Sequence, residues 1–315
     1  MTPIAVRFDP AAPYEVEESD VPFARPGGVE LLARVYRPQG EPAGPLAALV
    51  DVHGGAWTRL DRTIGAPHGR ALAAAGLCVV AIDFRQGPSH QHPAASADVA
   101  AGVRWVRRNA GRLGVDPRRI GILGSSSGGQ LALLVGIKPG APQHAGTPIL
   151  GPDGSLDARP GDDAVAFVLA LYPVADPLAR FRYAQSRQHE PPQPSGFNAT
   201  MLVEAHRAYF GSEEAMAEAS VTRILAAGEA GALPPAWVAQ PEFDDNVPAA
   251  ITDALVRAYR EAGGRIEHAH FPGARHSFIQ RPGPDTDKCV ALMRDFIGRQ
   301  LSRDGPPGFA APVAD

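Results

Sequence analysis

A glycine-flanked serine between two apolar segments most constrains how this chain can fold. Gly124 and Gly128 enclose three serines, after the apolar run 120–123 and before the helix-like run 129–135. A sharp turn from a strand into a helix leaves no room for a side chain at either flank, so glycine is needed at both positions. The middle serine, Ser126, then stands exposed at the tip of the turn. The N–H groups at the start of the helix point at the same spot and favour negative charge there.

Around this turn, the chain alternates between apolar runs and helix-like segments. Most of the apolar runs are continuous, which is typical of strands buried on both faces of a parallel sheet. The segment 94–112 has apolar residues at a spacing near 3.6, with Val99, Val103 and Val106 on one face, and is predicted to be a helix. We therefore expect an α/β fold with a mostly parallel, doubly wound sheet. The other predicted strands are 29–36, 46–52, 77–83, 164–172, 237–240 and 266–271, and the other predicted helices are 70–75, 248–263 and 287–299.

Composition divides the chain into one large domain with three additions. Residues 1–28 are polar and proline-rich, and we expect an N-terminal arm that packs on the surface. Residues 29–300 carry the alternation and form the α/β domain. Within them, 176–231 interrupt the pattern, which predicts a small cap or lid over the site; the alternative is a surface excursion without contact to substrate. Residues 301–315 form a Pro, Gly and Ala tail that we predict to be flexible.

Charge and cysteine usage exclude several classes of protein. The net charge of −4, from 30 basic and 34 acidic residues, offers no basic surface for nucleic acid. Cys78 and Cys289 do not form a C-x-x-C pair, so we expect two buried thiols rather than a disulfide framework or a metal site. The N-terminus has no secretory pattern, and no run approaches the roughly 18 apolar residues of a membrane helix. These features predict a cytoplasmic protein with neither a membrane nor a nucleic-acid partner.

The residues that would activate Ser126 follow it in the order acid, then histidine. A serine hydroxyl needs a base to take its proton, and a carboxylate that fixes the tautomer of the base makes it more effective. His276 lies in a loop after the last predicted strand, and the loop after the preceding strand holds the adjacent pair Asp244 and Asp245. Loops at the carboxyl ends of neighbouring strands meet at one edge of a sheet, which predicts a catalytic triad.

A tetrahedral intermediate also needs N–H donors, and the segment after the strand 46–52 can supply them. Its small residues let the backbone approach a ligand closely, so Gly55 and Ala56, together with Ser127, are the predicted oxyanion hole. His53 in the same segment is predicted to have a structural, hydrogen-bonding role.

Candidate pocket residues flank these loops. We assign Ser125, Trp57 and Phe278 to the substrate pocket, with packing in the core as an equal alternative for the two aromatics. The spaced histidine pairs 268/270 and 90/92 lack an evident third ligand, so no metal site is predicted, and the chemistry requires no cofactor.

Five motifs together resemble the bacterial esterase/lipase group of α/β-hydrolases, which is related to hormone-sensitive lipase and acetyl esterases. The resemblance covers about residues 29–299. It implies the α/β-hydrolase fold with a small cap insertion, and the D-x-x-V-P register selects Asp244 over Asp245 as the acid. The matching segments are 53–57 with H-G-G-G-[FW], 83–88 with D-Y-R-L-A-P, 124–129 with G-D-S-A-G-G, 244–248 with D-x-x-V-P, and 276–278 with H-x-F.

Four departures from the family pattern bear on the site. Ala56 replaces the third glycine of the oxyanion loop, so its N–H is kept while its methyl group narrows the acyl pocket. Ser125 and Ser127 replace the usual neighbours of the nucleophile. The pair 240–241 stands where the family has H-G before the acid. The N-terminal region is too short for the large helical cap of many relatives, which leaves 176–231 as the main cap.

The expected function is hydrolysis of carboxylic esters through a serine acyl-enzyme. A modest pocket and a polar cap favour small, short-chain or aryl esters as the small-molecule partner. The same groups also suit an amidase, an arylformamidase or a peptidase, and a non-catalytic ligand-binding protein of this fold is a further alternative. The resemblance also implies a homodimer through the last strand and helix.

Overall fold

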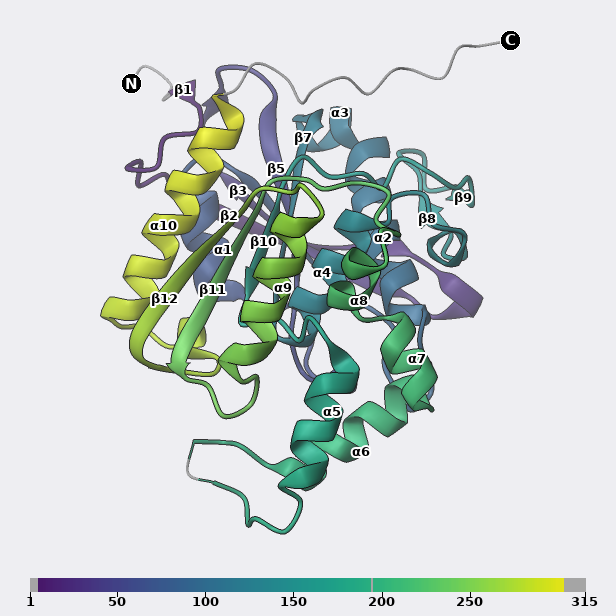
Figure 1. Cartoon of the computed structure of the whole chain (residues 1–315). Coiled ribbons are helices and arrows are strands. Elements are labelled where there is room, and N and C mark those ends of the chain that lie inside the picture. Colours follow the sequence, from purple (N-terminus) through teal and green to yellow (C-terminus); the bar gives the residue numbers. More distant parts are fainter. Residues whose placement is uncertain (1–4, 194, 303–315) are drawn as a thin grey trace.

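The computed structural model describes residues 5–193 and 195–302, and it arranges them around one ten-stranded sheet (Figure 1). The strand order is β12-β11-β10-β7-β5-β6-β3-β2-β8-β9. Neighbours from β12 to β6 pair in parallel, and those from β6 through β3 to β9 pair antiparallel. The sheet strands are β2 (Val16–Ala24), β3 (Leu31–Pro38), β5 (Leu46–Val52), β6 (Cys78–Ile82), β7 (Val115–Ser125), β8 (Ile149–Leu150), β9 (Leu156–Asp157), β10 (Val168–Leu171), β11 (Ala236–Phe243) and β12 (Ile266–Arg275).

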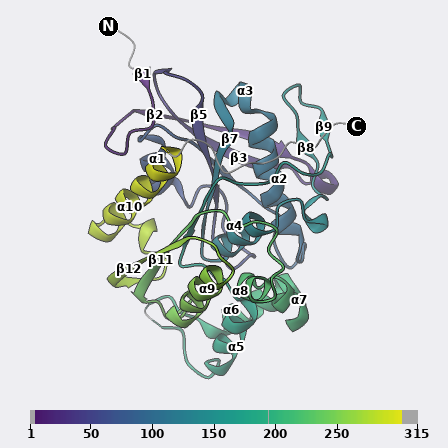
Figure 2. The same cartoon turned by 45° about the horizontal axis from the view of Figure 1, so that its top comes forward.

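Helices cover both faces of this sheet, as Figures 1 and 2 show, so the prediction of a mostly parallel, doubly wound α/β fold is confirmed. One face carries α1 (Ala66–Ala73) and α10 (Pro284–Leu301), and the other carries α2 (Ala94–Arg108), α4 (Ser127–Ile137) and α9 (Ala249–Glu261). The remaining short elements are β1 (Ala5–Val6) paired with β4 (Glu41–Pro42), α3 (Ala110–Leu113), and the 3-10 turns η1 (Pro26–Gly28), η2 (Pro142–His144) and η3 (Phe278–Gln280).

The alternation of side chains along a buried strand explains the two helical layers. In β5, Ala48 and Val50 belong to the core under α2 and α4, whereas Ala47 and Leu49 belong to the core under α1 and α10. Successive side chains of a strand point to opposite faces, so a continuous apolar run demands cover on both sides.

The predicted N-terminal arm is wrong for residues 16–24. These residues form β2, which pairs with β3 along its length and lies inside the main sheet. Most of the β2 side chains from Glu17 to Val21 are exposed, so the strand carries no apolar alternation by which the sequence could reveal it. Residues 1–4 of the arm and residues 303–315 of the predicted tail lie outside the described residues.

The segment 176–231 folds into four helices: α5 (Pro177–Ser186), α6 (Ala199–Phe210), α7 (Glu213–Glu218) and α8 (Val221–Ala226). Figure 1 shows α5, α6 and α7 gathered beyond the end of the sheet toward which β11 points. In contrast, α8 packs against α4 and α9 and belongs to the layer that covers the sheet. Each helix begins where a polar side chain caps a backbone N–H, so local sequence sets these boundaries. The capping residues are Asp176, Asn198, Ser212 and Ser220.

A buried carboxylate anchors the loop that follows β6. Asp98 is fully buried on α2 and accepts hydrogen bonds from the backbone N–H and guanidinium of Arg85 and from the Thr147 hydroxyl. Asp98→Ala should lower the free energy of unfolding by about 3–5 kcal/mol, because it leaves the partly buried Arg85 without its counter-charge. Urea denaturation measures this loss.

The matched control is Glu30→Ala, which breaks the ion pair of Arg25 and Glu30 on the surface, where both side chains are about half exposed. It should cost less than about 1 kcal/mol. Equal losses in the two variants would contradict the anchoring role of Asp98.

Candidate active site

The serine turn has the strained geometry that its sequence predicts. Ser126 lies between the end of β7 and the start of α4, with φ 54° and ψ −118°, a conformation that non-glycine residues rarely adopt. A Cβ atom on Gly124 would lie 2.2 Å from the carbonyl oxygen of Gly128, and one on Gly128 would lie 2.2 Å from that of Val52. Both flanks therefore require glycine for steric reasons.

The structure brings the three predicted triad residues together. His276 Nε2 lies 3.0 Å from Ser126 Oγ, and His276 Nδ1 lies 2.8 Å from Asp244 Oδ2. Asp244 and His276 each stand one residue beyond the ends of β11 and β12, which are paired in parallel. The other oxygen of Asp244 accepts the backbone N–H groups of Asn246 and Val247 at 3.0 and 2.7 Å. These bonds hold the carboxylate toward the imidazole.

The two candidate acids have different partners. Asp244 is bonded to His276, whereas the Asp245 carboxylate accepts a hydrogen bond from the Ser195 hydroxyl in the cap segment. Asp245 therefore ties the acid loop to the cap.

The imidazole is packed against a buried tyrosine. The ring centroid of Tyr172 lies 4.6 Å from that of His276 in an edge-on arrangement, and burial raises the pKa of the Tyr172 hydroxyl above its usual value. Phe278 packs on Tyr172 and Phe271, with centroids 6.0 and 4.8 Å away. These contacts restrict the imidazole orientation.

The predicted oxyanion loop passes directly beside the nucleophile. A Cβ on Gly54 would lie 3.3 Å from Ser126 Cβ, and one on Gly55 would lie 1.9 Å from the Arg59 carbonyl oxygen. Gly55 and Ala56 both have positive φ, and within the described residues their N–H groups donate to no acceptor. Ser127 is the first residue of α4, where the helix itself leaves the N–H without a partner.

His53 stabilises this loop through a hydrogen bond to its backbone. Its Nδ1 lies 2.7 Å from the Gly54 carbonyl oxygen, and its ring stacks on Phe84 with centroids 4.2 Å apart. Burial lowers the pKa of His53, so the ring is neutral with the proton on Nδ1, where it donates to the carbonyl. This matches the structural role expected for His53.

A cavity of about 320 Å³ opens above Ser126, between the oxyanion loop and the cap. Ser125 lies in its wall, as expected. The lining comprises Gly54, Gly55, Ala56, Arg59, Leu60, Ser125, Ser126, Arg180, Ser195, Gly196, Phe197, Leu202, Asp245, Asn246, His276, Ser277, Gln280 and Arg281.

For Trp57 and Phe278 the geometry agrees with the alternative of core packing, because neither is among the residues that line this cavity. Trp57 is fully buried, stacks on Tyr209 with centroids 5.7 Å apart, and donates from Nε1 to Gln130 Oε1 at 3.0 Å. The backbone at Trp57 has φ 60°, so the chain reverses direction here and the indole packs in the core against the cap helices. Phe278 packs against Tyr172 and Phe271 instead.

The cap contributes lining residues that sequence reasoning missed. Arg180 and Leu202 come from α5 and α6, which carry no family motif. Arg180 lies four residues after the capping Asp176, and nothing in that pattern distinguishes it from a surface arginine.

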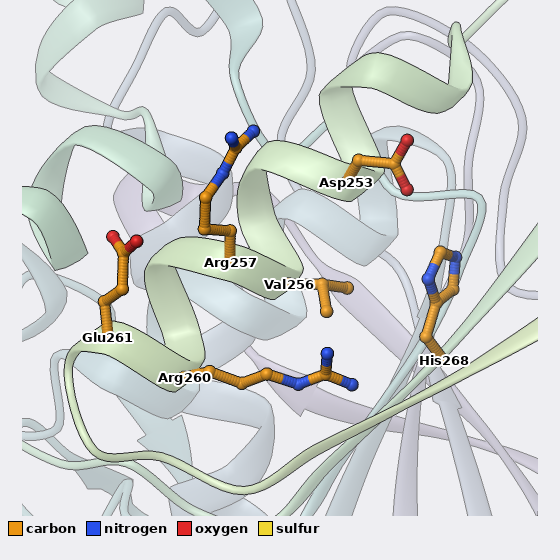
Figure 3. A pocket seen from close by; sticks show the side chains of 6 residues that line it. All are labelled: Asp253, Val256, Arg257, Arg260, Glu261 and His268. Carbon is orange, nitrogen blue, oxygen red and sulfur yellow. The ribbon is translucent and has the colours of Figure 1, made fainter.

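A second hollow lies between α9 and β12 (Figure 3). Its charged lining residues are mostly exposed and of both signs, so it has no preference for one kind of ligand. The residues are Asp253, Val256, Arg257, Arg260, Glu261 and His268.

Two features are absent from the described residues. No group of three or more His, Cys, Asp or Glu side chains that could hold a metal is found there. No helix among them has the length and apolar character needed to cross a membrane.

Comparison with known proteins identifies the family to which the chain belongs. Residues 49–280, more than half of the chain, match the alpha/beta hydrolase fold family. The chain belongs to this family. The resemblance expected from the five motifs is thereby confirmed.

Curated relatives of this hydrolase are esterases. Esterase LipQ of Mycobacterium tuberculosis is 29% identical over 96% of this chain and 68% of its own length. Esterase LipC of the same organism is 27% identical over 86% of this chain and 64% of its own length. Ethyl acetate hydrolase of Pseudomonas putida is 26% identical over 90% of this chain and 83% of its own length.

Solved structures agree with this fold. The carboxylesterase EstE1 from a metagenomic library superimposes with a TM-score of 0.72 at 24% identity, covering 92% of this chain and 90% of that chain. Esterase Est2 of Thermogutta terrifontis gives a TM-score of 0.67 at 25% identity, covering 96% of this chain and 95% of that chain.

The steric role of the turn is testable by a single methyl group. Gly128→Ala should lower both the free energy of unfolding, by about 1–3 kcal/mol, and any turnover that depends on Ser126, because the new Cβ would overlap the carbonyls of Val52 and His53. Gly111→Ala is the control, since it meets no atom within 4 Å in the short helix α3 and should be neutral or slightly stabilising. Urea denaturation measures both, and an unperturbed Gly128→Ala would contradict the steric requirement.

Proposed function

We propose that this protein is a serine hydrolase that cleaves carboxylic esters through an acyl-enzyme on Ser126. The observation that carries the proposal is the single imidazole of His276, which lies within hydrogen-bond distance of both Ser126 Oγ and Asp244 Oδ2. This is the arrangement that converts a serine hydroxyl into a nucleophile. The esterase names of the curated relatives support the choice of bond.

In the acylation half, Asp244 accepts the Nδ1–H of His276, which leaves Nε2 free as the base. Ser126 Oγ attacks the ester carbonyl while its proton moves to Nε2. The oxygen of the tetrahedral intermediate accepts the N–H groups of Gly55, Ala56 and Ser127. The C–O bond to the alcohol then breaks, and Nε2 returns the proton to the leaving oxygen.

The deacylation half uses the same groups with water as the nucleophile. Nε2 takes one proton from water as its oxygen attacks the acyl carbon, and the bond to Ser126 Oγ breaks as Oγ regains a proton from Nε2. The products are one carboxylic acid and one alcohol. Asp244 stabilises the imidazolium formed in each half.

The size of the cavity favours a short or aryl acyl group. About 320 Å³ is near the lower end of ordinary ligand pockets, and the methyl group of Ala56 replaces the hydrogen of the third family glycine at its wall. Cap residues Phe197 and Leu202 also line the space beside Ser126. Long acyl chains therefore have little room.

The first test measures hydrolysis of p-nitrophenyl esters from C2 to C12, with p-nitroacetanilide as the matched amide. We expect kcat/KM to fall with chain length and the ester to exceed the anilide. Ser126→Ala should reduce kcat by at least about 10⁴-fold while the protein keeps its circular dichroism spectrum. A folded wild-type protein without ester turnover would overturn the proposal, and a preference for the anilide would favour an amidase.

The acid assignment has its own test in a matched pair. Asp244→Asn should reduce kcat by about 10⁴-fold, because the amide cannot hold His276 in the required tautomer. Asp245→Asn should cost far less, because its carboxylate is bonded to Ser195 rather than to the imidazole. Steady-state kinetics on the acetyl ester decides between them, and a larger loss in Asp245→Asn would reverse the assignment.

A further inference from the structure

A buried arginine without a counter-charge lines the candidate active site. Arg180 on α5 is 1% exposed and lies in the wall of the cavity. Its Nη1 donates to Asn246 Oδ1 at 2.7 Å, its Nε donates to His206 Nε2 at 3.3 Å, and its guanidinium carbon lies 5.5 Å from the Trp57 ring centroid. Its Nη2 is buried and has no hydrogen-bond partner within the described residues.

The groups around this guanidinium are all neutral or already engaged. Asn246 is an amide, and burial beside Arg180 holds the pKa of His206 well below its usual value, so that imidazole is uncharged. The Asp244 carboxylate attracts Arg180, but its own hydrogen bonds go to His276 and two backbone N–H groups. Burial lowers the pKa of Arg180 to about 9, which leaves it cationic at neutral pH.

A buried cation of this kind is unfavourable unless something compensates it. Removing an uncompensated charge from water costs several kcal/mol, and an unpaired N–H group adds to that cost. Packing does not require arginine at this position, because an apolar side chain would fill the same space without the penalty. A bound anion would supply both the missing charge and the acceptor for Nη2.

Two further arginines in the cavity wall carry positive charge, as Arg180 does. Arg59 and Arg281 also line it and are exposed, and neither forms an ion pair within the described residues. Against these three cations, the lining includes the carboxylate of Asp245, which faces Ser195. The field inside the cavity therefore favours a negatively charged ligand.

We propose that the substrate of this site is an ester that carries a free carboxylate, and that Arg180 binds this carboxylate through Nη2 beneath the cap. A half-ester of a dicarboxylic acid and an acyl ester of a hydroxy acid both have this chemistry; they place the carboxylate on the acyl and alcohol sides respectively. The inference rests on the proposed ester hydrolysis and names its substrate class. Arg180 is then a specificity-determining residue rather than part of the triad.

Two matched substrate pairs test the proposal and separate the two sides. Monomethyl adipate and dimethyl adipate differ by a carboxylate on the acyl side, and acetoxyacetic acid and its methyl ester differ on the alcohol side. We expect kcat/KM in one pair to be about 10- to 100-fold higher for the anion, the range of a charge-assisted hydrogen bond. Turnover of neutral esters without preference for either anion would overturn this inference alone, whereas no turnover of any ester would overturn the proposed function.

Arg180→Met separates anion binding from a structural role in holding Asn246. Loss of the anion site should remove the preference, because KM should rise far more for the anionic ester than for the neutral ester. Arg180→Lys should restore part of the preference. Arg182→Met is the matched control, since this arginine on the same helix is exposed and pairs with Glu213 on the surface. An equal fall in kcat for both esters would overturn the proposal.

An inhibition measurement keeps the proposal testable if Arg180→Met does not fold. Free adipate, which has no ester bond, should inhibit wild-type hydrolysis of p-nitrophenyl acetate competitively, and adipamide should inhibit at least about tenfold more weakly. Added salt should weaken the adipate inhibition less than it would at an exposed site, because the guanidinium is buried. Equal inhibition by the diacid and the diamide would overturn the proposal.

Discussion

The close approach of the serine turn to the end of β5 is the constraint on which the rest of the site depends. Gly128 lies against the carbonyls of Val52 and His53, so the oxyanion loop and the helix N-terminus are held beside the same atom. Backbone bonds from Ser126 to Leu171 and from Val174 to Ser126 tie the strained residue to β10. Strain of about 1–3 kcal/mol persists there because the surrounding sheet determines the conformation.

The parallel sheet turns three distant residues into one site. Ser126 and His276 are 150 positions apart in the chain, yet their side chains meet because β7, β10, β11 and β12 are successive neighbours whose carboxyl ends share one edge. Ser126, Asp244 and His276 follow the ends of β7, β11 and β12 directly, so little loop flexibility separates them. A rigid edge of this kind keeps the imidazole within hydrogen-bond distance of both partners.

In the proposed function, the cap supplies specificity at a cost in stability. The sheet and its loops provide the proposed reacting groups, whereas α5 and α6 supply Arg180 and Leu202 to the cavity wall. A buried guanidinium with neutral neighbours opposes folding, and the proposed carboxylate ligand would offset that cost when it binds.

The sequence by itself determined the fold class and the order of the proposed reacting residues, because steric rules at Gly124 and Gly128 and the apolar strand runs act over only a few positions. It also carried Ser126 and His276 in recognisable motifs. Tertiary structure decided what those local rules do not reach: that the polar strand β2 joins the sheet, that Trp57 turns into the core, and that Asp245 faces the cap. It alone placed Arg180 in the cavity, because the burial of a charge depends on helices packed from distant parts of the chain.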